Sequence, residues 1–220
     1  MRILSVRVGR PATHPVPVGE GEAPEFFRSA IAKVAVEGPV GLTSRGLAGD
    51  QVEDTRVHGG PDQAVLAYAA AHYPAWRAEW GRDDVGYGGF GENLTVEGAD
   101  EETVCLGDRW SVEGALLEVT KPRSPCNRLA WYQQREDLIE RVRATGRSGW
   151  YLRVLAEGNV QAGAGIELVE RPYPGLTVRR AALAMMNRSA NREEAMTLAL
   201  CGALADDWRL RLAKEGFRRR

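Results

Sequence analysis

The chain has 220 residues, of which 44% are hydrophobic and 27% charged, and its formal net charge is −1. This composition permits a packed core and excludes a disordered chain, and the near-zero net charge argues against a protein that binds nucleic-acid polymers. No run of about 18 apolar residues occurs, so we expect no membrane span. The length fits one large domain, alone or with a small additional domain.

The N-terminus and the cysteines indicate the compartment. The residues that follow Met1 resemble a strand and lack the long apolar stretch of a signal peptide. Cys105, Cys126 and Cys201 are widely spaced and form no CxxC pair, so there is no structural zinc signature. Both observations predict a protein of the reducing cytoplasm.

Short runs of strand-forming residues, separated by glycines, fill most of the chain. Turns at this frequency predict a β-barrel or a β-sandwich. The expected strands are 3–8, 32–37, 41–44, 64–68, 94–96, 109–112, 115–120, 150–155 and 166–170.

Two helices are expected to interrupt the strands. Residues 70–80 carry three aromatic side chains at helical spacing, most simply for core packing, and Pro74 falls within the first turn. Residues 135–145 place apolar side chains on one face and end at Gly146. The Pro- and Gly-rich residues 11–25 are expected to form a loop near the mouth of a site.

The sequence changes character after Arg171, where two prolines and a glycine predict a domain boundary. Thr177 can cap a first helix, Asn191 has the pattern that opens a second, and Trp208 belongs to a third. We therefore predict a mainly β (α+β) fold, with a barrel-like domain at residues 1–172 and a small three-helix domain at 173–220. A unit this small is expected to pack on the barrel or on a partner.

Cys126 is the most informative residue. It follows Pro122 and Pro125 and lies among Lys121, Arg123 and Arg128. Proline interrupts helices and central strands, so the segment is expected to be a loop that leaves the strand at 115–120. Cationic neighbours favour the thiolate, the form that attacks electrophiles and binds soft metals. A cysteine packed as a small hydrophobe is the alternative, and local chemistry leaves both open.

Arg56, His58, Gly59 and Gly60 form a second segment of interest. Adjacent glycines let backbone N–H groups approach an anion, and an arginine can bind phosphate with two hydrogen bonds. His58 could donate a proton near neutral pH. The alternative is a tight turn with a surface histidine.

Two further segments carry polar groups beside glycines. Asn93 follows Gly91-Glu92 and offers both donors and an acceptor to a heterocycle, unless it only forms a turn into the next strand. Residues 146–153 hold two arginines that could contact an anion. Trp150 and Tyr151 should point to opposite faces of a strand, so that one of them is core.

Together these segments supply a soft ligand, several cations, a glycine-rich backbone and a histidine. The set suits a large anionic cofactor that carries a phosphate and a thiophilic metal. A common hydrolase is not indicated, because the GxSxG motif and a histidine near Cys126 in sequence are missing, and GxxxxGK[ST] is also absent. His72 lies within an expected helix and is more simply structural.

At these residues the chain resembles the MOSC-domain family (molybdenum cofactor sulfurase C-terminal domain), and in particular its bacterial YiiM-like subgroup. The order and spacing agree over roughly residues 1–170, and the helical end resembles the three-helix domain of that subgroup. Each motif is weak alone, whereas several in register are specific. The matching segments are 46–50, 56–65, 91–94, 106–108, 122–126 and 149–154.

The resemblance implies a barrel-like fold that binds the molybdenum cofactor, a pterin dithiolene with a phosphate. The family's cysteine maps to Cys126, which would ligate molybdenum as a thiolate. Cys126 and His58 are the candidate catalytic residues, with His58 as proton donor. The candidate cofactor-binding residues are Arg56, His58, Gly59, Gly60, Asn93, Thr120, Arg123, Ser124, Cys126 and Arg128.

The resemblance also implies reduction of N-hydroxylated small molecules such as 6-hydroxylaminopurine. The chain has no flavin, haem or iron–sulfur motif, so we expect an external electron-donor protein, most simply a flavoprotein reductase. A carrier of the cofactor, or of a persulfide on Cys126, is the alternative. The helical end makes a homodimer a further expectation.

Overall fold

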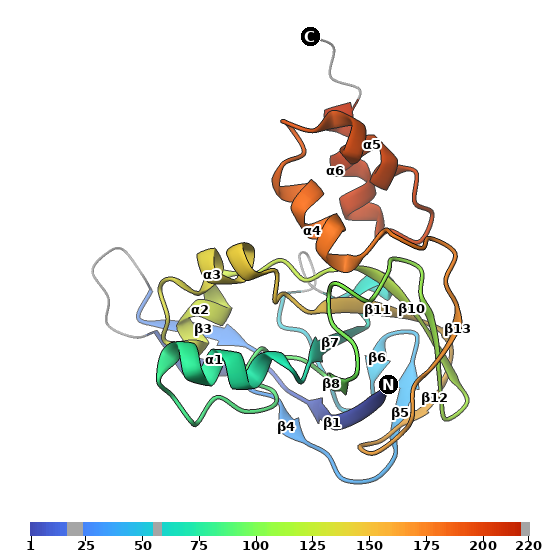
Figure 1. Cartoon of the computed structure of the whole chain (residues 1–220). Helices are drawn as coiled ribbons and strands as arrows, with labels where there is room; N and C mark the ends of the chain where they lie inside the picture. The colour runs from blue at the N-terminus through green and yellow to red at the C-terminus, as the bar shows by residue number, and fades with distance from the viewer. Residues whose placement is uncertain (17–23, 55–58, 217–220) are drawn as a thin grey trace.

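The computed structural model describes residues 1–16, 24–54 and 59–216. Within these residues, eight strands form a curled sheet shaped like a half-barrel, with short helices beside it and a helical unit above it (Figure 1). The sheet order is β13-β9-β10-β11-β7-β8-β1-β4. Its strands are β1 (Arg2–Val8), β4 (Val34–Ala35), β7 (Val65–Ala69), β8 (Leu94–Glu97), β9 (Arg109–Val112), β10 (Ala115–Pro122), β11 (Trp150–Ala156) and β13 (Glu167–Glu170).

The predicted α+β fold with a barrel-like body is therefore confirmed. Neighbouring strands in the large sheet are antiparallel except β7 and β8, which are parallel. The helix α1 (His72–Trp80) joins those two strands, as a parallel pair requires. The concave side encloses an apolar core that includes Trp110, Leu117 and Trp150.

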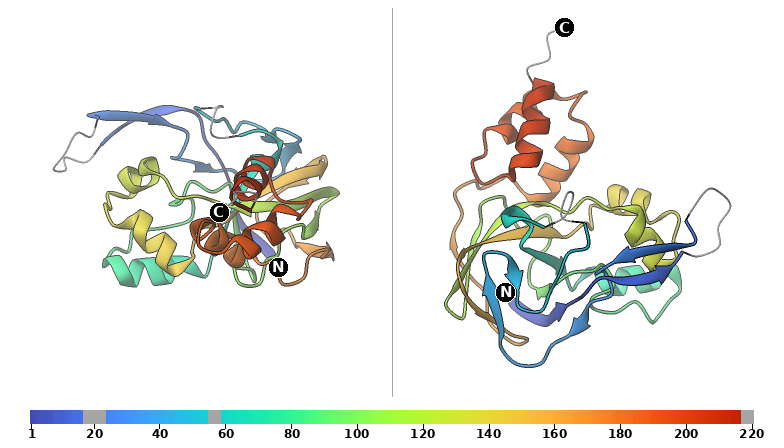
Figure 2. Two further views of the ribbon diagram at one scale, coloured as in Figure 1. Left: turned by 90° about the horizontal axis from the view of Figure 1, so that it is seen from above. Right: turned by 180° about the vertical axis from the view of Figure 1, so that it is seen from behind.

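Two smaller groups of strands complete the body. β12 (Gly158–Val160), β5 (Val40–Thr43) and β6 (Gly46–Leu47) form one sheet. β2 (Ala12–Pro15) and β3 (Phe26–Ser29) form a hairpin that projects from the body (Figure 2). The loop expected at residues 11–25 was thus partly wrong, because residues 12–15 form β2 and pair with β3, which begins just after the expected loop. Residues 17–23 lie outside the described part of the chain.

α1, α2 (Asn127–Gln133) and α3 (Leu138–Thr145) enclose a second, aromatic core. Tyr73, Trp76 and Trp80 of α1 are buried there, which confirms the expected packing of the aromatic stripe. β3 lies against α2, where the rings of Phe27 and Trp131 are 5.5 Å apart. The sequence did not predict α2, which begins immediately after Cys126.

The three C-terminal helices are α4 (Val178–Met186), α5 (Arg192–Ala199) and α6 (Asp206–Gly216). The predicted caps are confirmed: Thr177 accepts from the N–H of Arg180 and Asn191 from that of Glu194, both at 3.1 Å. The helices share an apolar cluster, to which the barrel contributes Leu106. The boundary at residue 172 stays a prediction.

Polar contacts join this helical unit to the sheet. Lys121 of β10 donates to both carboxylate oxygens of Asp207, at 2.8 and 2.9 Å. The N–H of Ala205 donates to the carbonyl of Thr120 at 3.2 Å. These contacts place α6 against the end of β10, the strand that leads to Cys126. No described helix has both the length and the apolarity needed to cross a bilayer.

Candidate functional site

Cys126 opens into a pocket of about 190 Å³ between β10, the loop before β8 and the chain that follows β6. The wall carries charged and polar side chains as well as backbone glycines. Its members include Lys33, Asp50, Gly59, Asn93, Arg123, Cys126, Arg128 and Tyr151. Five predicted site residues, Gly59, Asn93, Arg123, Cys126 and Arg128, thus line one pocket.

The backbone places Cys126 at the rim of this pocket. β10 continues through Pro122, which pairs with Trp150, so the strand runs two residues beyond its predicted end. Proline is tolerated there because it ends the strand and need not donate to the ladder. Cys126 is extended (φ −135°, ψ 165°) and its carbonyl accepts the N–H of Leu129 at 3.0 Å, so it forms the N-cap of α2. The half-buried thiol is therefore held at a strand-to-helix corner.

Two guanidinium groups beside Cys126 have no carboxylate partner among the residues that the structure describes. Arg123 is only 7% exposed, and within the described residues its side chain makes no hydrogen bond or ion pair. Arg128, half-buried on the same wall, makes none either in this part of the chain. By contrast, Lys33 is neutralised by Asp50, with Nζ 2.5 Å from Oδ1. Although Asp50, Glu53 and Asp54 also line the pocket, the guanidinium groups of Arg123 and Arg128 are the charges that would bind an anion beside the thiol.

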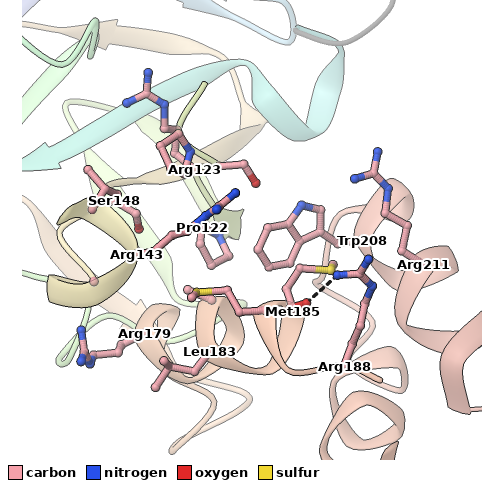
Figure 3. A pocket seen from close by; sticks show the side chains of 16 residues that line it. Pro122, Arg123, Arg143, Ser148, Arg179, Leu183, Met185, Arg188, Trp208 and Arg211 are labelled. Atoms are coloured by element: carbon pink, nitrogen blue, oxygen red, sulfur yellow. Dashed lines mark hydrogen bonds between the residues drawn. The ribbon is translucent and has the colours of Figure 1, made fainter. Parts of the chain in front are cut away.

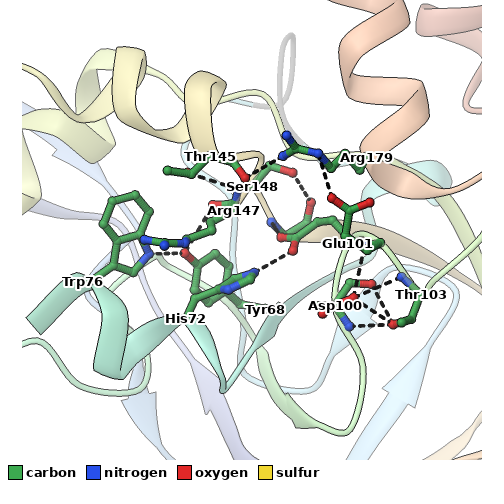
Figure 4. A network of polar contacts seen from close by, with 12 residues as sticks. Tyr68, His72, Trp76, Asp100, Glu101, Thr103, Thr145, Arg147, Ser148 and Arg179 are labelled. Atoms are coloured by element: carbon green, nitrogen blue, oxygen red, sulfur yellow. Dashed lines mark hydrogen bonds and ion pairs between the residues drawn. The ribbon is translucent and has the colours of Figure 1, made fainter. Parts of the chain in front are cut away.

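A buried network of hydrogen bonds holds the backbone at Gly149, to which the backbone of Arg123 is hydrogen-bonded (Figure 4). Glu101, 3% exposed, accepts the N–H of Gly149 at 2.6 Å and lies 2.6 Å from Nε2 of His72. The carbonyl of Gly149 in turn accepts the N–H of Arg123 at 3.0 Å. His72 therefore has a structural role, as the sequence predicted. Glu101 was not predicted, because it lies in an acidic segment whose sequence does not indicate burial.

The same network holds the connection between α3 and β11 from its other side. Trp76 donates to the hydroxyl of Tyr68 at 2.6 Å, and that hydroxyl donates to the carbonyl of Arg147 at 3.2 Å. The guanidinium of Arg147 lies 4.8 Å from the Trp76 ring centre, a cation–π distance. Arg147, which the sequence suggested as a possible anion contact, instead packs against Trp76 and stabilises this connection.

The side chain of Asn93 is occupied by structural contacts. Its Oδ1 accepts the N–H of Leu66 at 3.0 Å, and its Nδ2 donates to the carbonyl of Arg7 and to Asp50, at 3.2 and 2.9 Å. Asn93 lines the pocket, but its side chain mainly holds Asp50 and the neighbouring backbone in place.

Glu92 was not predicted. It is fully buried and accepts hydrogen bonds from Tyr73, from the N–H groups of Gly88 and Phe90, and from Thr95. Burial, followed by the charge of Glu92, raises the pKa of Tyr73 well above 10.0. An acid between a glycine and Asn93 was the available signal, because a carboxylate can collect the free N–H groups of a glycine-rich turn.

Three further predicted residues, Thr120, Gly60 and Ser124, do not line this pocket. Thr120 is buried and its hydroxyl donates 2.7 Å to the carbonyl of Asp62, in the short helix η1 (Pro61–Gln63). Gly60 (φ 81°) caps η1, and Ser124 is exposed and lines a second cavity. Arg56 and His58 lie outside the described residues.

Trp150 and Tyr151 point to opposite faces of β11, as expected, and one of them is core. Trp150 is fully buried in the core, and Tyr151 faces the Cys126 pocket. Burial raises the pKa of Tyr151, an effect that Arg123 opposes and a negative Cys126 strengthens. The phenol is therefore neutral near pH 7 and can donate a hydrogen bond.

Residues 54–167, which contain Cys126, Arg123 and Arg128, match the MOSC domain family. The chain belongs to the MOSC domain family. Among curated proteins it is 36% identical to Protein YiiM of Escherichia coli over 89% of each chain, and 35% identical to the uncharacterized protein YflK of Bacillus subtilis over 97% of this chain and 93% of that one. It is also 36% identical to a protein named Reductase from Gibberella moniliformis, across 98% of this chain but only 37% of that longer protein.

Solved structures agree with this membership. The crystal structure of YiiM from Geobacillus stearothermophilus matches with a TM-score of 0.80 and 32% identity, covering 98% of each chain. That of YiiM from Escherichia coli matches with a TM-score of 0.77 and 28% identity, covering 98% of this chain and 92% of that one. The resemblance to the YiiM-like subgroup is confirmed.

MOSC domains are associated with the molybdenum cofactor, and the residues of this pocket fit such a group. Cys126 provides a soft donor, and Arg123 and Arg128 provide two cations that have no carboxylate partner in the described part of the chain. Gly59 (φ 79°) offers backbone that a side chain would obstruct. The pocket is smaller than the roughly 300–1,000 Å³ of typical cofactor sites, so a cofactor would extend beyond the volume that the described residues enclose.

Proposed function

We propose that this MOSC protein is a molybdenum-cofactor-dependent reductase of N-hydroxylated small molecules, including hydroxylated purine bases such as 6-hydroxylaminopurine. The observation that supports this most is the half-buried thiol of Cys126 between Arg123 and Arg128, two cations with no carboxylate partner among the described residues. A similar protein that bears the name Reductase supports an oxidoreductase.

The proposed reaction converts R–NH–OH, two electrons and two protons into R–NH2 and water. When bound, the cofactor supplies the metal centre that exchanges these electrons. Cys126 would hold the metal as a thiolate, while Arg123 and Arg128 would bind the anionic part of the cofactor. Tyr151, whose pKa is raised by burial, would keep its phenol protonated and orient a polar substrate. His58 stays the candidate proton donor.

The electrons would come from a separate protein, most simply a flavoprotein reductase. The runner-up function is a carrier, in which the half-buried Cys126 holds a persulfide or delivers the cofactor. A thiol at the rim of an open pocket is accessible to a sulfur donor, which is the observation in its favour.

One assay separates the two functions. The protein, expressed in a host that makes the cofactor, is given 6-hydroxylaminopurine and an artificial electron donor, and adenine is measured. The reductase predicts adenine formation by the wild type and none by Cys126→Ala. No turnover by the wild type, together with a labile persulfide on Cys126, would establish the carrier instead.

A further inference from the structure

A second and larger cavity, of about 460 Å³, lies between the barrel and the C-terminal helices. Figure 3 shows its centre, where Pro122, Met185 and Trp208 come together. The segment that carries Cys126 forms part of its wall through Pro122 and Arg123. Arg123 also lines the Cys126 pocket, so the two spaces share one side chain.

The charged residues that line this cavity are all cationic among those described. The described lining includes no acidic residue. It includes five arginines: Arg123, Arg143, Arg179, Arg188 and Arg211. A chain with a net charge of −1 has no general excess of cations. The local excess therefore creates a positive potential in a partly enclosed space, where it attracts anions more strongly than on an open surface.

Several of these cations are not neutralised. Within residues 1–16, 24–54 and 59–216, the side chains of Arg123, Arg143 and Arg211 make no hydrogen bond or ion pair. Arg179 is paired with Glu102 at 2.8 Å, and Arg188 donates to the carbonyl of Met185 at 2.9 Å. Three separate elements, the β10–α2 connection, α3 and α6, thus each present to the same cavity a guanidinium that has no partner among the described residues.

The remainder of the wall is apolar and polarizable. Trp208, Met185, Leu183 and Val142 line it. Such surfaces suit a flat aromatic ring, and methionine adapts to the outline of a ligand. Guanidinium groups that converge from several directions suit a tetrahedral phosphate, which accepts hydrogen bonds on several oxygens. The volume lies within the roughly 300–1,000 Å³ typical of small-molecule sites.

We infer that this cavity binds a nucleoside monophosphate, with its phosphate on the arginines and its base against Trp208 and the methionine side. The site is separate from the Cys126 pocket and does not depend on the proposed reductase activity. Because Arg123 lines both the cavity and the Cys126 pocket, a ligand bound in the cavity can contact the segment that carries Cys126.

The test measures AMP binding to the full-length protein by isothermal titration calorimetry at low salt. The Arg143→Ala/Arg211→Ala double variant removes the two exposed free cations. Arg141→Ala/Arg209→Ala is its matched control, because it removes one arginine from each of the same helices without touching the cavity lining. Both variants alter exposed or half-buried side chains, and circular dichroism verifies that they fold.

We expect AMP to bind the wild type and the control alike, and to bind the double variant about tenfold or more weakly, since each lost charge-assisted hydrogen bond weakens binding. Adenosine should bind more weakly than AMP. Equal AMP affinity in the double variant, or no AMP binding at millimolar concentration, would overturn the inference. Inorganic phosphate that binds as tightly as AMP would also overturn it, because the base would then contribute nothing.

A Cys126→Ala variant separates this inference from the proposed function. It should lose reductase activity and keep the AMP affinity of the wild type. If AMP binding instead disappears in Cys126→Ala and persists in the arginine double variant, the nucleotide occupies the Cys126 pocket, and the inference fails while the reductase assignment stands.

Discussion

The side-chain amide of Asn93 donates to Asp50 across the wall of the Cys126 pocket, with Nδ2 2.9 Å from Oδ2. Its Oδ1 also accepts the N–H of Leu66, and the residue is only 4% exposed. Asn93→Ala leaves a buried backbone donor without a partner, so we expect the free energy of unfolding to fall by about 1–3 kcal/mol in urea denaturation. Asn159→Ala, at an exposed strand position, is the control and should change it by less than about 0.5 kcal/mol. Equal effects of the two substitutions would refute this role.

The burial of Tyr73 should lower the free energy of unfolding at alkaline pH. Its folded-state pKa is raised well above 10.0, first by burial and then by Glu92. The stabilisation is therefore complete below pH 10.0 and is lost as the pH rises, because the unfolded chain can ionise and the folded chain resists ionisation. Between pH 9 and pH 11 the wild type should lose about 1.4 kcal/mol more than Tyr73→Phe. Parallel losses in the two proteins, measured by urea unfolding at each pH, would exclude this assignment.

The ion pair between Lys121 and Asp207 should stabilise the docking of the helical unit. Lys121 has a side chain that is 5% exposed, whereas that of Asp207 is 44% exposed. Asp207→Asn removes the charge that compensates a buried ammonium, and we expect a loss of about 1–3 kcal/mol by thermal or urea unfolding. Asp206→Asn, which breaks only the exposed pair with Arg209, should cost under about 1 kcal/mol. The prediction fails if the neighbouring Asp206→Asn proves equally destabilising.

Arg123 should show opposite effects on stability and on cofactor content. Its guanidinium is buried and makes no ion pair within the described residues, which is unfavourable until an anion binds. Cofactor-free Arg123→Met should therefore be as stable as the wild type, or more stable by about 1 kcal/mol, but should retain less molybdopterin. Arg147→Met is the comparison, because Arg147 pairs with Glu79 at 2.9 Å and lies over Trp76, and its loss should destabilise. Destabilisation by Arg123→Met with unchanged pterin content would contradict this role.

Much of the fold followed from local patterns. The strand Arg109–Val112 alternates in burial and is followed by a turn at Glu113 and Gly114. Gly146 adopts the left-handed conformation that stops α3, so sequence signals and structure agree at both places. The β2–β3 hairpin was missed because its four-residue strands depend on pairing across residues distant in sequence. α2 was missed because two prolines precede it, although Pro125 lies just outside the helix and does not interrupt it.

The candidate site was predictable in composition and less so in roles. Cys126, Arg123 and Arg128 were identified from their own segment and do share a pocket. Asn93 and Thr120 were read as ligand-binding residues, and their side chains prove to be engaged in holding the backbone. Such roles depend on which buried donors and acceptors meet after folding, which spacing along the chain does not reveal. The roles of Arg56 and His58 stay predictions.

The central claim is that the thiolate of Cys126 holds molybdenum. The most direct measurement is the molybdenum content per chain of three proteins purified from a host that makes the cofactor: wild type, Cys126→Ala and Cys201→Ala. Cys201 is 2% exposed within the helical unit and serves as the control for loss of a thiol. We predict about one molybdenum per chain in the wild type and in Cys201→Ala, and almost none in Cys126→Ala. A Cys126→Ala protein that retains as much molybdenum as the wild type would contradict the claim.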